Sequence, residues 1–370
     1  MRIFIIGAHP SSLLNFRGEL IRSLLSSGHQ VYALASGAER SDVVKIESQG
    51  VIYIDYPVNR NGLNPLSDII TLLNFIRLFV KYSPDLVLSY TIKPVIWAGI
   101  ASKLFSNVRF YGLITGLGFA FQGGGVRRNF LVRIVSGLYS LSLSGATKIL
   151  FQNPDNLQVF VDRKIIPKEK SSCVNGSGVD LDHYIVSEPG AREITFLSIA
   201  RLLGEKGLRE YAAAAKIIKR KYPDVVFQLL GPEDPSPDGI SISEVNTWQE
   251  AGYIEYLGSA DDVRPYLNNC NIFVLPSYHE GLPRTVLEAM AVGRPILTTN
   301  VPGCKETVVD GENGFLVPAK SVEALVDCME RFILNPNLIK TMGRRSREIA
   351  EEKYDVHKVN QSILEIMGLS

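Results

Sequence analysis

Two glutamates, Glu280 and Glu288, lie eight positions apart where a predicted strand gives way to a predicted helix. The apolar run at 272–275 predicts a buried parallel strand, and the apolar spacing after Pro283 predicts the helix. Backbone N–H groups at a helix N-terminus attract anions, and a carboxylate accepts two neighbouring hydroxyl donors. This stretch could therefore bind a phosphate at the helix N-terminus. One carboxylate could accept hydrogen bonds from the hydroxyl groups of a sugar, and the other from those of a ribose. The alternative is a pair of ordinary exposed glutamates, since Glu is mostly exposed in proteins.

The residues around this pair resemble the E-x7-E signature of the family 4 retaining glycosyltransferases. The positions that fit are Glu280, Gly281, Leu282, Pro283, Glu288, Ala289, Met290 and Ala291. A strand predicted at 194–199 precedes Arg201 and Lys206, and this loop resembles the GR…KG donor-phosphate motif of the family, with Ala200 in place of its glycine. The resemblance covers nearly the whole chain. It implies a GT-B fold, in which two doubly wound α/β domains face each other across a cleft.

The same resemblance implies that a UDP-sugar is the donor. The diphosphate would lie on Arg201 and Lys206, the Thr285 hydroxyl and nearby backbone N–H groups, and the ribose would lie on Glu288. Glu280 would hold the sugar or its oxocarbenium-like charge without forming a covalent bond. The implied donor-binding set is Arg201, Lys206, Gly281, Leu282, Pro283, Arg284, Thr285 and Glu288. The family transfers with retention of configuration, and fixed cations with a helix N-terminus can stabilise the leaving diphosphate without a metal or another cofactor.

The first half resembles the amino-terminal domain of family members that lengthen lipid-linked glycans by adding N-acetylhexosamines. The matching segments are 12–17, 90–94, 116–121 and 151–154. The resemblance implies transfer of GalNAc or GlcNAc to a polyprenyl-diphosphate-linked sugar in the assembly of bacterial surface polysaccharide or glycoprotein glycans. Many family members have a histidine near the sugar, and the matching region at 113–116 has none.

Candidate acceptor residues lie in loops or near helix starts of this first half. Arg17 and Lys93 are candidates for the carrier diphosphate, because both are expected near the ligand-binding edge of the sheet. The matching segments of the resemblance add Thr115, Gly116 and Asn153 as acceptor-binding candidates.

A membrane surface is an expected partner of the first half. Residues 1–187 contain 19 Lys and Arg against 12 Asp and Glu, and residues 188–370 contain 20 against 26. Residues 126–143 predict a basic apolar helix next to a glycine-rich loop at 111–125, with Arg127, Arg128, Phe130 and Arg133 as membrane-binding candidates. The alternative is a helix packed on the sheet with a solvated basic end. Residues 68–80 are too short for a membrane span and indicate a buried helix.

Length and composition limit the class of protein. A chain of 370 residues with 46% apolar residues predicts two globular domains, and a net charge of only +1 argues against a nucleic-acid partner. The expected domains are 1–187 for the acceptor and the membrane, 188–352 for the donor, and a helix at 353–370 that returns to the first domain. The four cysteines are far apart, which indicates small core residues in a reducing compartment. We expect a cytoplasmic protein bound peripherally to the inner membrane face.

Three other interpretations stay open at this stage. A sugar-nucleotide epimerase of the same fold would convert a UDP-sugar with no acceptor present, and a non-catalytic binding protein would turn nothing over. Asp180 and Asp182 form a D-x-D pattern that holds a divalent metal in the other major glycosyltransferase fold, although such patterns often arise by chance.

Overall fold

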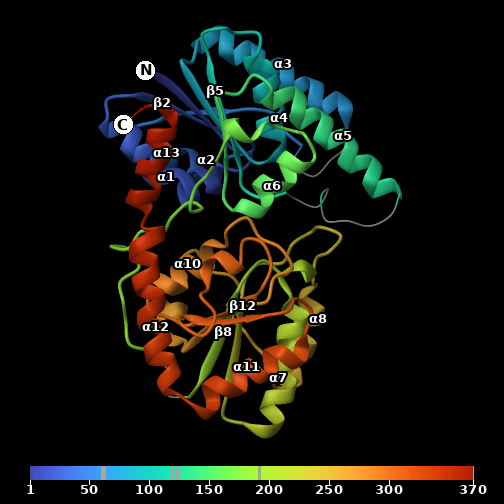
Figure 1. The fold of residues 1–370 in the computed structure, drawn as a ribbon, viewed down its shortest axis with the longest axis vertical. Helices are drawn as coiled ribbons and strands as arrows, with labels where there is room; N and C mark the ends of the chain where they lie inside the picture. The colour runs from blue at the N-terminus through green and yellow to red at the C-terminus, as the bar shows by residue number, and fades with distance from the viewer. Residues whose placement is uncertain (60–63, 118–120, 122–125, 191–192, 370) are drawn as a thin grey trace. The chain divides into compact units, whose positions relative to one another are not determined.

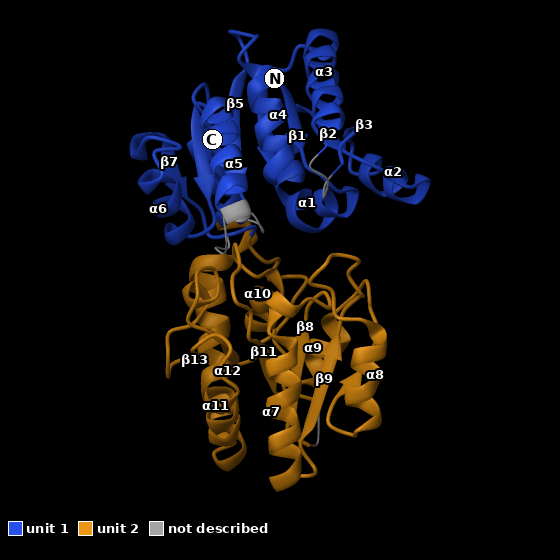
Figure 2. Ribbon diagram, turned by 90° about the vertical axis from the view of Figure 1, so that its right-hand side faces the viewer, with its two compact units in different colours: residues 1–177, 359–370 blue, residues 178–358 orange. Residues whose placement is uncertain are grey.

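The computed structural model describes residues 1–59, 64–117, 121, 126–190 and 193–369, and the chain divides into two compact units. Unit 1 comprises 1–177 and 359–370, and unit 2 comprises 178–358 (Figure 2). These boundaries differ from the expected ones, after 187 and 352. Val179 forms a β-bridge with Asp355, and the Val356 N–H donates to the Val179 carbonyl at 3.0 Å. This pairing ties 178–187 to the segment before the last helix, and both belong to unit 2.

Unit 1 is built on a seven-stranded parallel sheet with the strand order β3-β2-β1-β4-β5-β6-β7. Its strands are β1 (Arg2–Ile6), β2 (Gln30–Ala35), β3 (Ile52–Asp55), β4 (Leu86–Tyr90), β5 (Arg109–Ile114), β6 (Lys148–Phe151) and β7 (Ser171–Cys173). In β1, Phe4 and Ile6 face one core cluster and Ile3 and Ile5 face the other, so the strand is buried on both sides. This explains its continuous apolar run.

Helices cover both faces of this sheet. They are α1 (Pro10–Ser26), α2 (Arg40–Glu47), α3 (Pro65–Tyr82), α4 (Ile92–Ser102), α5 (Val126–Leu143), α6 (Pro154–Asp162) and α13 (Val356–Met367), with a short turn η2 (Lys168–Lys170). α3, α4, α5 and α6 share one core cluster, and α1, α2 and α13 share the other (Figure 1). The last helix therefore packs on unit 1, where Ile363 is buried and the Tyr111 hydroxyl donates to the Met367 carbonyl at 3.1 Å.

Unit 2 has a six-stranded parallel sheet with the order β10-β9-β8-β11-β12-β13. Its strands are β8 (Thr195–Ile199), β9 (Val226–Leu230), β10 (Glu255–Tyr256), β11 (Ile272–Leu275), β12 (Ile296–Thr299) and β13 (Gly314–Val317). Both sheets follow the doubly wound order. The chain adds strands outward from the first strand on one side and then returns to add strands on its other side. Ligands of such sheets bind at the carboxyl ends of the first strand and of its neighbour on that other side, here β1 with β4 and β8 with β11.

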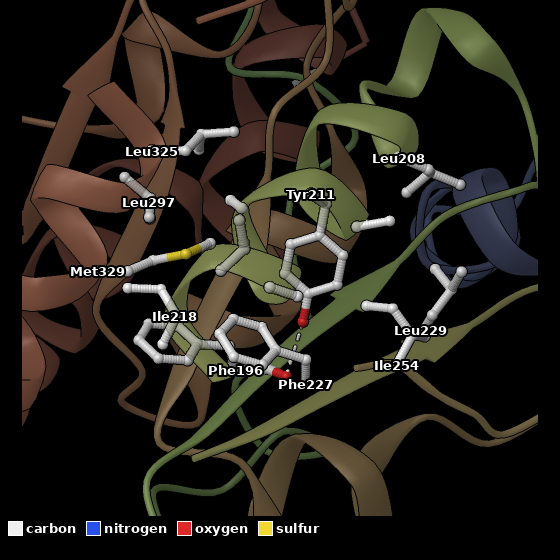
Figure 3. Close-up of a cluster of buried hydrophobic side chains, with 14 of the residues drawn as sticks. Phe196, Leu208, Tyr211, Ile218, Phe227, Leu229, Ile254, Leu297, Leu325 and Met329 are labelled. Carbon is white, nitrogen blue, oxygen red and sulfur yellow. Dashed lines mark hydrogen bonds between the residues drawn. The ribbon is translucent and has the colours of Figure 1, made fainter. Parts of the chain in front are cut away.

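The helices of unit 2 are α7 (Leu208–Lys221), α8 (Ile242–Glu250), α9 (Arg264–Asn269), α10 (Arg284–Ala291), α11 (Val322–Leu334) and α12 (Asn337–Ile349), with short 3₁₀ helices η3 (Gly204–Lys206) and η4 (Lys305–Thr307) and a π-helix η5 (Ala350–Tyr354). The fully buried Tyr211 of α7 packs in the main cluster of this unit and donates from its hydroxyl to the Phe196 carbonyl of β8 at 2.8 Å (Figure 3). Since the loop 200–207 joins β8 to α7, this contact fixes both of its ends. The two sheets confirm the predicted α/β fold class.

Three expectations about local environments are wrong. α3 is not a buried helix, because it lies at the edge of its helical layer and only one side contacts the core. Its buried residues are Thr71, Phe75 and Phe79, whereas Leu66, Ile69, Ile70, Leu73 and Val80 are at least half exposed. Cys173 is exposed, because it ends the edge strand β7. Arg17 is not at a helix start, because α1 begins at Pro10.

The sequence left open whether α5 packs on the sheet or presents a basic apolar surface to a membrane, and the helix has both features. Val132, Tyr139 and Leu143 are buried in unit 1, while Phe130, Ile134 and Leu141 are exposed together with Arg133. Residues 111–114 of the predicted glycine-rich loop belong to β5, while residues 118–120 and 122–125 and the side chains of Arg127 and Arg128 lie outside the described residues. Within the described ranges, no helix has both the length and the apolar character needed to cross a membrane.

Candidate active site

The candidate donor residues of unit 2 come from two loops that follow neighbouring strands. β8 and β11 pair directly, and the loop after β8 carries Arg201 and Lys206 while the loop after β11 carries Glu280. The Tyr278 N–H donates to the Glu205 carbonyl at 2.8 Å, which joins the loops. A Cβ on Gly207, whose φ is +69°, would lie 2.0 Å from the Pro276 carbonyl oxygen, so only glycine permits this approach.

Lys206 and Glu280 form an ion pair at the centre of these loops. The Lys206 Nζ lies 2.6 Å from Glu280 Oε1, and each side chain is only 14% exposed. The Ser277 hydroxyl donates to the same carboxylate oxygen at 2.7 Å. Burial by itself lowers the pKa of Lys206, but the Glu280 carboxylate outweighs it, so the pKa lies above its ordinary value. Lys206 is therefore a fixed, permanently charged ammonium at neutral pH.

Glu288 is buried, which contradicts the alternative of an ordinary exposed glutamate. Its residue exposure is 6%, and its Oε1 accepts from the Arg284 Nε at 2.7 Å, one helical turn away in α10. Tyr184 lies beside this pair: burial raises the pKa of its hydroxyl, and the Glu288 carboxylate adds to the rise. A buried carboxylate held by one cation keeps acceptor lone pairs for a hydroxyl donor.

The N-terminus of α10 lies between the two glutamates, as the sequence predicts. Pro283 occupies the N-cap position and has no side-chain acceptor to cap the helix, and it contributes no N–H group. Gly281, Leu282 and Thr285 are partly exposed before and within the first turn. The helix dipole and the first-turn N–H groups together favour an anion at this end.

Arg201 is the most exposed of the three candidate cations, with 60% of its side chain accessible. Its NH1 lies 2.5 Å from Asp234 Oδ2, in the loop that follows β9. Partial burial raises the pKa of Asp234, but hydrogen bonds from Ser236 and the Arg201 charge lower it below its ordinary value. Arg201, Lys206 and Arg284 are thus each paired with a carboxylate, and an incoming phosphate would share or replace these partners.

The candidate carrier-binding cations of unit 1 are also partnered. Arg17 is 2% exposed, and its guanidinium lies over the Tyr90 ring at 5.1 Å. The hydroxyl groups of Tyr90 and Ser12 are hydrogen-bonded at 2.8 Å. Burial raises the pKa of Tyr90 to about 12, although Ser12 and Arg17 oppose the rise. Lys93, the second residue of α4, lies 2.7 Å from Asp68 Oδ1 of α3.

The remaining acceptor candidates lie at the carboxyl ends of neighbouring strands. Thr115 and Gly116 follow β5 and are partly exposed. Asn153 follows β6 and is buried, and its Oδ1 accepts from the Asn156 N–H at 2.8 Å as the N-cap of α6. Asn153 therefore has a structural role that the sequence analysis did not anticipate.

Sequence reasoning missed four residues of the unit 2 site: Ser277, Asp234, Gly303 and Tyr184. Ser277 and Asp234 each lie in a loop that begins directly after a strand, a signal that could have found them. Gly303 has a φ of +87°, and a Cβ there would lie 2.4 Å from the Glu280 carbonyl oxygen. No sequence signal identifies Tyr184, because only the fold brings it to Glu288.

The D-x-D pattern has a local role. Asp180 Oδ1 accepts from the backbone N–H groups of Asp182 at 3.0 Å and His183 at 2.9 Å, which closes a turn. In the part of the chain that the structure describes, no group of three or more His, Cys, Asp or Glu side chains could hold a metal ion. Metal-independent activity stays a prediction.

Residues 186–349 match the family described as glycosyl transferases group 1, and residues 8–153 match the family described as glycosyl transferase 4-like, so the chain contains two glycosyltransferase family domains. The fold is GT-B, and the enzyme is by class a hexosyltransferase. The predicted family, fold and enzyme class are thereby confirmed.

Three curated relatives align over most of the chain. An N,N'-diacetylbacillosaminyl-diphospho-undecaprenol alpha-1,3-N-acetylgalactosaminyltransferase of Campylobacter jejuni is 27% identical, with 99% of this chain and 98% of the relative covered. The capsular polysaccharide biosynthesis glycosyltransferase CapM of Staphylococcus aureus is 27% identical, with 95% of this chain and 93% of the relative covered. A UDP-Gal:alpha-D-GlcNAc-diphosphoundecaprenol alpha-1,3-galactosyltransferase of Escherichia coli is 22% identical, with 82% and 80% covered.

Solved structures share the fold at lower identity. A sucrose-phosphate synthase of Thermosynechococcus elongatus superposes with a TM-score of 0.81 at 18% identity, over 99% of this chain and 98% of the other. HepE of Anabaena, in complex with UDP-glucose, also has a TM-score of 0.81, at 17% identity, over 100% of this chain and 99% of the other.

Proposed function

We propose that this protein transfers an N-acetylhexosamine, GalNAc or GlcNAc, from a UDP-sugar to a sugar on a polyprenyl diphosphate, with retention of the anomeric configuration. The observation that carries the proposal is the Lys206–Glu280 ion pair beside the N-terminus of α10. A cation, a helix N-terminus and two carboxylates gathered at the β8/β11 edge match the anionic and hydroxyl groups of a nucleotide sugar.

In this proposal unit 2 binds the donor. Lys206, Arg201 and the first turn of α10 bind the diphosphate, and Glu288 binds the ribose. During transfer, the bond between the anomeric carbon and the diphosphate oxygen breaks and negative charge grows on the diphosphate. Fixed cations stabilise that charge in place, so that no metal is needed. Glu280 holds the sugar as its positive charge develops. The acceptor hydroxyl attacks from the face that the diphosphate leaves, and its proton passes to the departing diphosphate oxygen.

Unit 1 binds the acceptor in this proposal. The relatives from Campylobacter jejuni and Escherichia coli carry diphospho-undecaprenol in the names of their acceptors, and both names describe an alpha-1,3 linkage. Thr115, Gly116 and Asn153 lie at strand ends, where acceptor sugars would bind. Lys93 and Arg17 remain candidates for the carrier diphosphate. Binding there would weaken the ion pair between Lys93 and Asp68 and the contact of Arg17 with the Tyr90 ring.

We place the protein peripherally on the cytoplasmic membrane face, where a polyprenyl-linked acceptor is reached. The exposed Phe130 and Arg133 of α5 support this, and Arg127 and Arg128 precede them in the same helix. Each basic residue near an anionic surface contributes about 1 kcal/mol, which suits reversible attachment.

Incubation of the protein with radiolabelled UDP-GalNAc or UDP-GlcNAc and a polyprenyl-diphosphate-linked sugar tests the function. We expect label in the lipid product with one of the two donors, and no product from Glu280→Ala. Conversion of the UDP-sugar without acceptor would indicate an epimerase instead. Binding of UDP-sugar with no turnover under any condition would contradict the proposal in favour of a binding protein.

A further inference from the structure

The outward side of α3 carries a row of exposed aliphatic side chains, which we name the α3 stripe. It consists of Leu66, Ile69, Ile70, Leu73 and Val80, whose exposure ranges from 50% to 72%. Their spacing puts them on one side of the helix, while Phe75 and Phe79 on the other side are buried in the core of unit 1. A helix that only covers a sheet needs apolar residues on the side that faces the sheet. The stripe lies on the other side, so it is a candidate binding surface.

The charges of α3 are asymmetric around the stripe. Arg77 and Lys81 are exposed, and Arg77 falls between Leu73 and Val80 on the same side. Asp68 is the only acidic residue of the helix, and it lies in a largely buried ion pair with Lys93 at 2.7 Å. The outward side therefore offers aliphatic groups and positive charge, with its one carboxylate neutralised.

A second surface of the same character lies on α5. Helix α4 packs between α3 and α5, and all three contribute to one core cluster on the same side of the sheet (Figure 1). The exposed Phe130, Ile134 and Leu141 of α5 accompany Arg133, and α5 contains no acidic residue. Both outward sides thus point away from the same core and carry the same chemistry.

We propose that the α3 stripe inserts into the boundary between head groups and acyl chains of an anionic lipid leaflet, with Arg77 and Lys81 at lipid phosphates. This inference rests on the proposed function, because a polyprenyl-linked acceptor is presented at such a surface. We favour a lipid leaflet over a protein partner because the stripe lies beside the exposed Arg77 and Lys81, and the one carboxylate of the helix, on Asp68, is paired with Lys93. Aliphatic groups combined with positive charge match an anionic head-group layer. Interfacial helices lie in the membrane plane with their apolar side inserted.

Flotation with vesicles of equal parts phosphatidylcholine and phosphatidylglycerol tests the insertion. We expect the wild type to float at low salt and to retain part of its binding at about 0.5 M salt, where charge attraction is screened but apolar insertion is not. The variant L66S/I69S/L73S should lose that salt-resistant part, with at least ~10-fold weaker partitioning overall. The matched control V44S/I217S/L334S removes three exposed aliphatic residues outside the stripe and should float like the wild type.

Two results would overturn the insertion. One is flotation of the stripe variant equal to that of the wild type at both salt concentrations. The other is a wild-type dimer that the stripe variant dissociates in analytical ultracentrifugation, since the stripe would then be a contact between two copies. Turnover with a short-chain, water-soluble acceptor is measured on the same samples. If the wild type shows no turnover of this acceptor, the proposed function is contradicted. The flotation result tests only the membrane insertion.

Discussion

The Lys206 Nζ lies 2.6 Å from Glu280 Oε1 and thereby joins the loop after β8 to the loop after β11. Both side chains are mostly buried, so each charge compensates the other in a place where an isolated charge would be costly. A bound diphosphate would offer Lys206 a second anion. The pair is therefore expected to support both the fold of unit 2 and the binding of the donor.

Replacing Lys206 by alanine should lower kcat/KM for the UDP-sugar by about 10- to 100-fold, because a charge-assisted contact to the diphosphate is lost. The free energy of unfolding should fall by about 1–3 kcal/mol, since one cation is removed from beside the buried Glu280 carboxylate. Steady-state kinetics and urea unfolding measure the two effects. Lys221 pairs with Glu330 at 2.8 Å on an exposed part of α7, and Lys221→Ala should change neither quantity appreciably. Equal behaviour of the two variants would contradict the assigned role.

The pH dependence of stability should reflect the raised pKa of Lys206. A group whose pKa is raised by folding contributes full stability below its unfolded pKa, and loses it as the pH rises through the folded value. The ordinary value is 10.5, and the folded value lies above it. The difference in unfolding free energy between the wild type and Lys206→Met should stay constant from about pH 7 to 9 and shrink only above about pH 10.5. A difference that already declines near pH 8 in urea titrations would rule this out.

Gly303 should be required for the position of Glu280. A Cβ at this residue would lie 2.4 Å from the Glu280 carbonyl oxygen and 2.7 Å from its Cβ, so Gly303→Ala must displace the loop. Gly311 has a similar φ of +82° but open space around it, which makes Gly311→Ala a matched control. Both variants should lose about 1 kcal/mol of stability from backbone strain, and only Gly303→Ala should lose at least ~10-fold in turnover. Equal activity of the two variants would show that the loop tolerates the shift.

Glu288 should discriminate donors by their ribose hydroxyls. In the proposed complex its buried carboxylate accepts from the ribose diol, so the wild type should bind UDP more tightly than 2′,3′-dideoxy-UDP by about 10-fold or more. Glu288→Gln keeps the size of the side chain but loses its charge, and the preference should largely disappear. Calorimetric titration of both nucleotides into both proteins gives the comparison. An unchanged preference in Glu288→Gln would assign the ribose to other residues.

Transfer should continue in excess EDTA, because the leaving diphosphate is expected to be stabilised by Lys206, Arg201 and the α10 N-terminus. Product formation with and without the chelator should agree within about twofold. Asp180→Asn should likewise leave turnover intact, since Asp180 closes a local turn. Loss of activity in EDTA with recovery in Mn²⁺ would instead assign a metal to the reaction.

The sequence by itself determined the elements and the location of the donor motif. The apolar run at 272–275 is β11, the helix after Pro283 is α10, and the last predicted helix is α13, which lies within the expected segment 353–370. These elements are encoded locally, because apolar spacing, proline and glycine act within a few residues. The family and the GT-B fold also followed from residues that stand together in the sequence.

The tertiary structure alone decided which charges meet and which surfaces remain open. Lys206 and Glu280 are 74 positions apart and become partners only because β8 and β11 are neighbours in the sheet. Arg17 is buried beside Tyr90, which no pattern in α1 indicates. The apolar residues at 68–80 predicted burial, but α3 contacts the core on one side only and leaves Leu73 exposed. Pairing and burial depend on which elements pack together, and apolar periodicity specifies that an element is apolar without specifying what covers it.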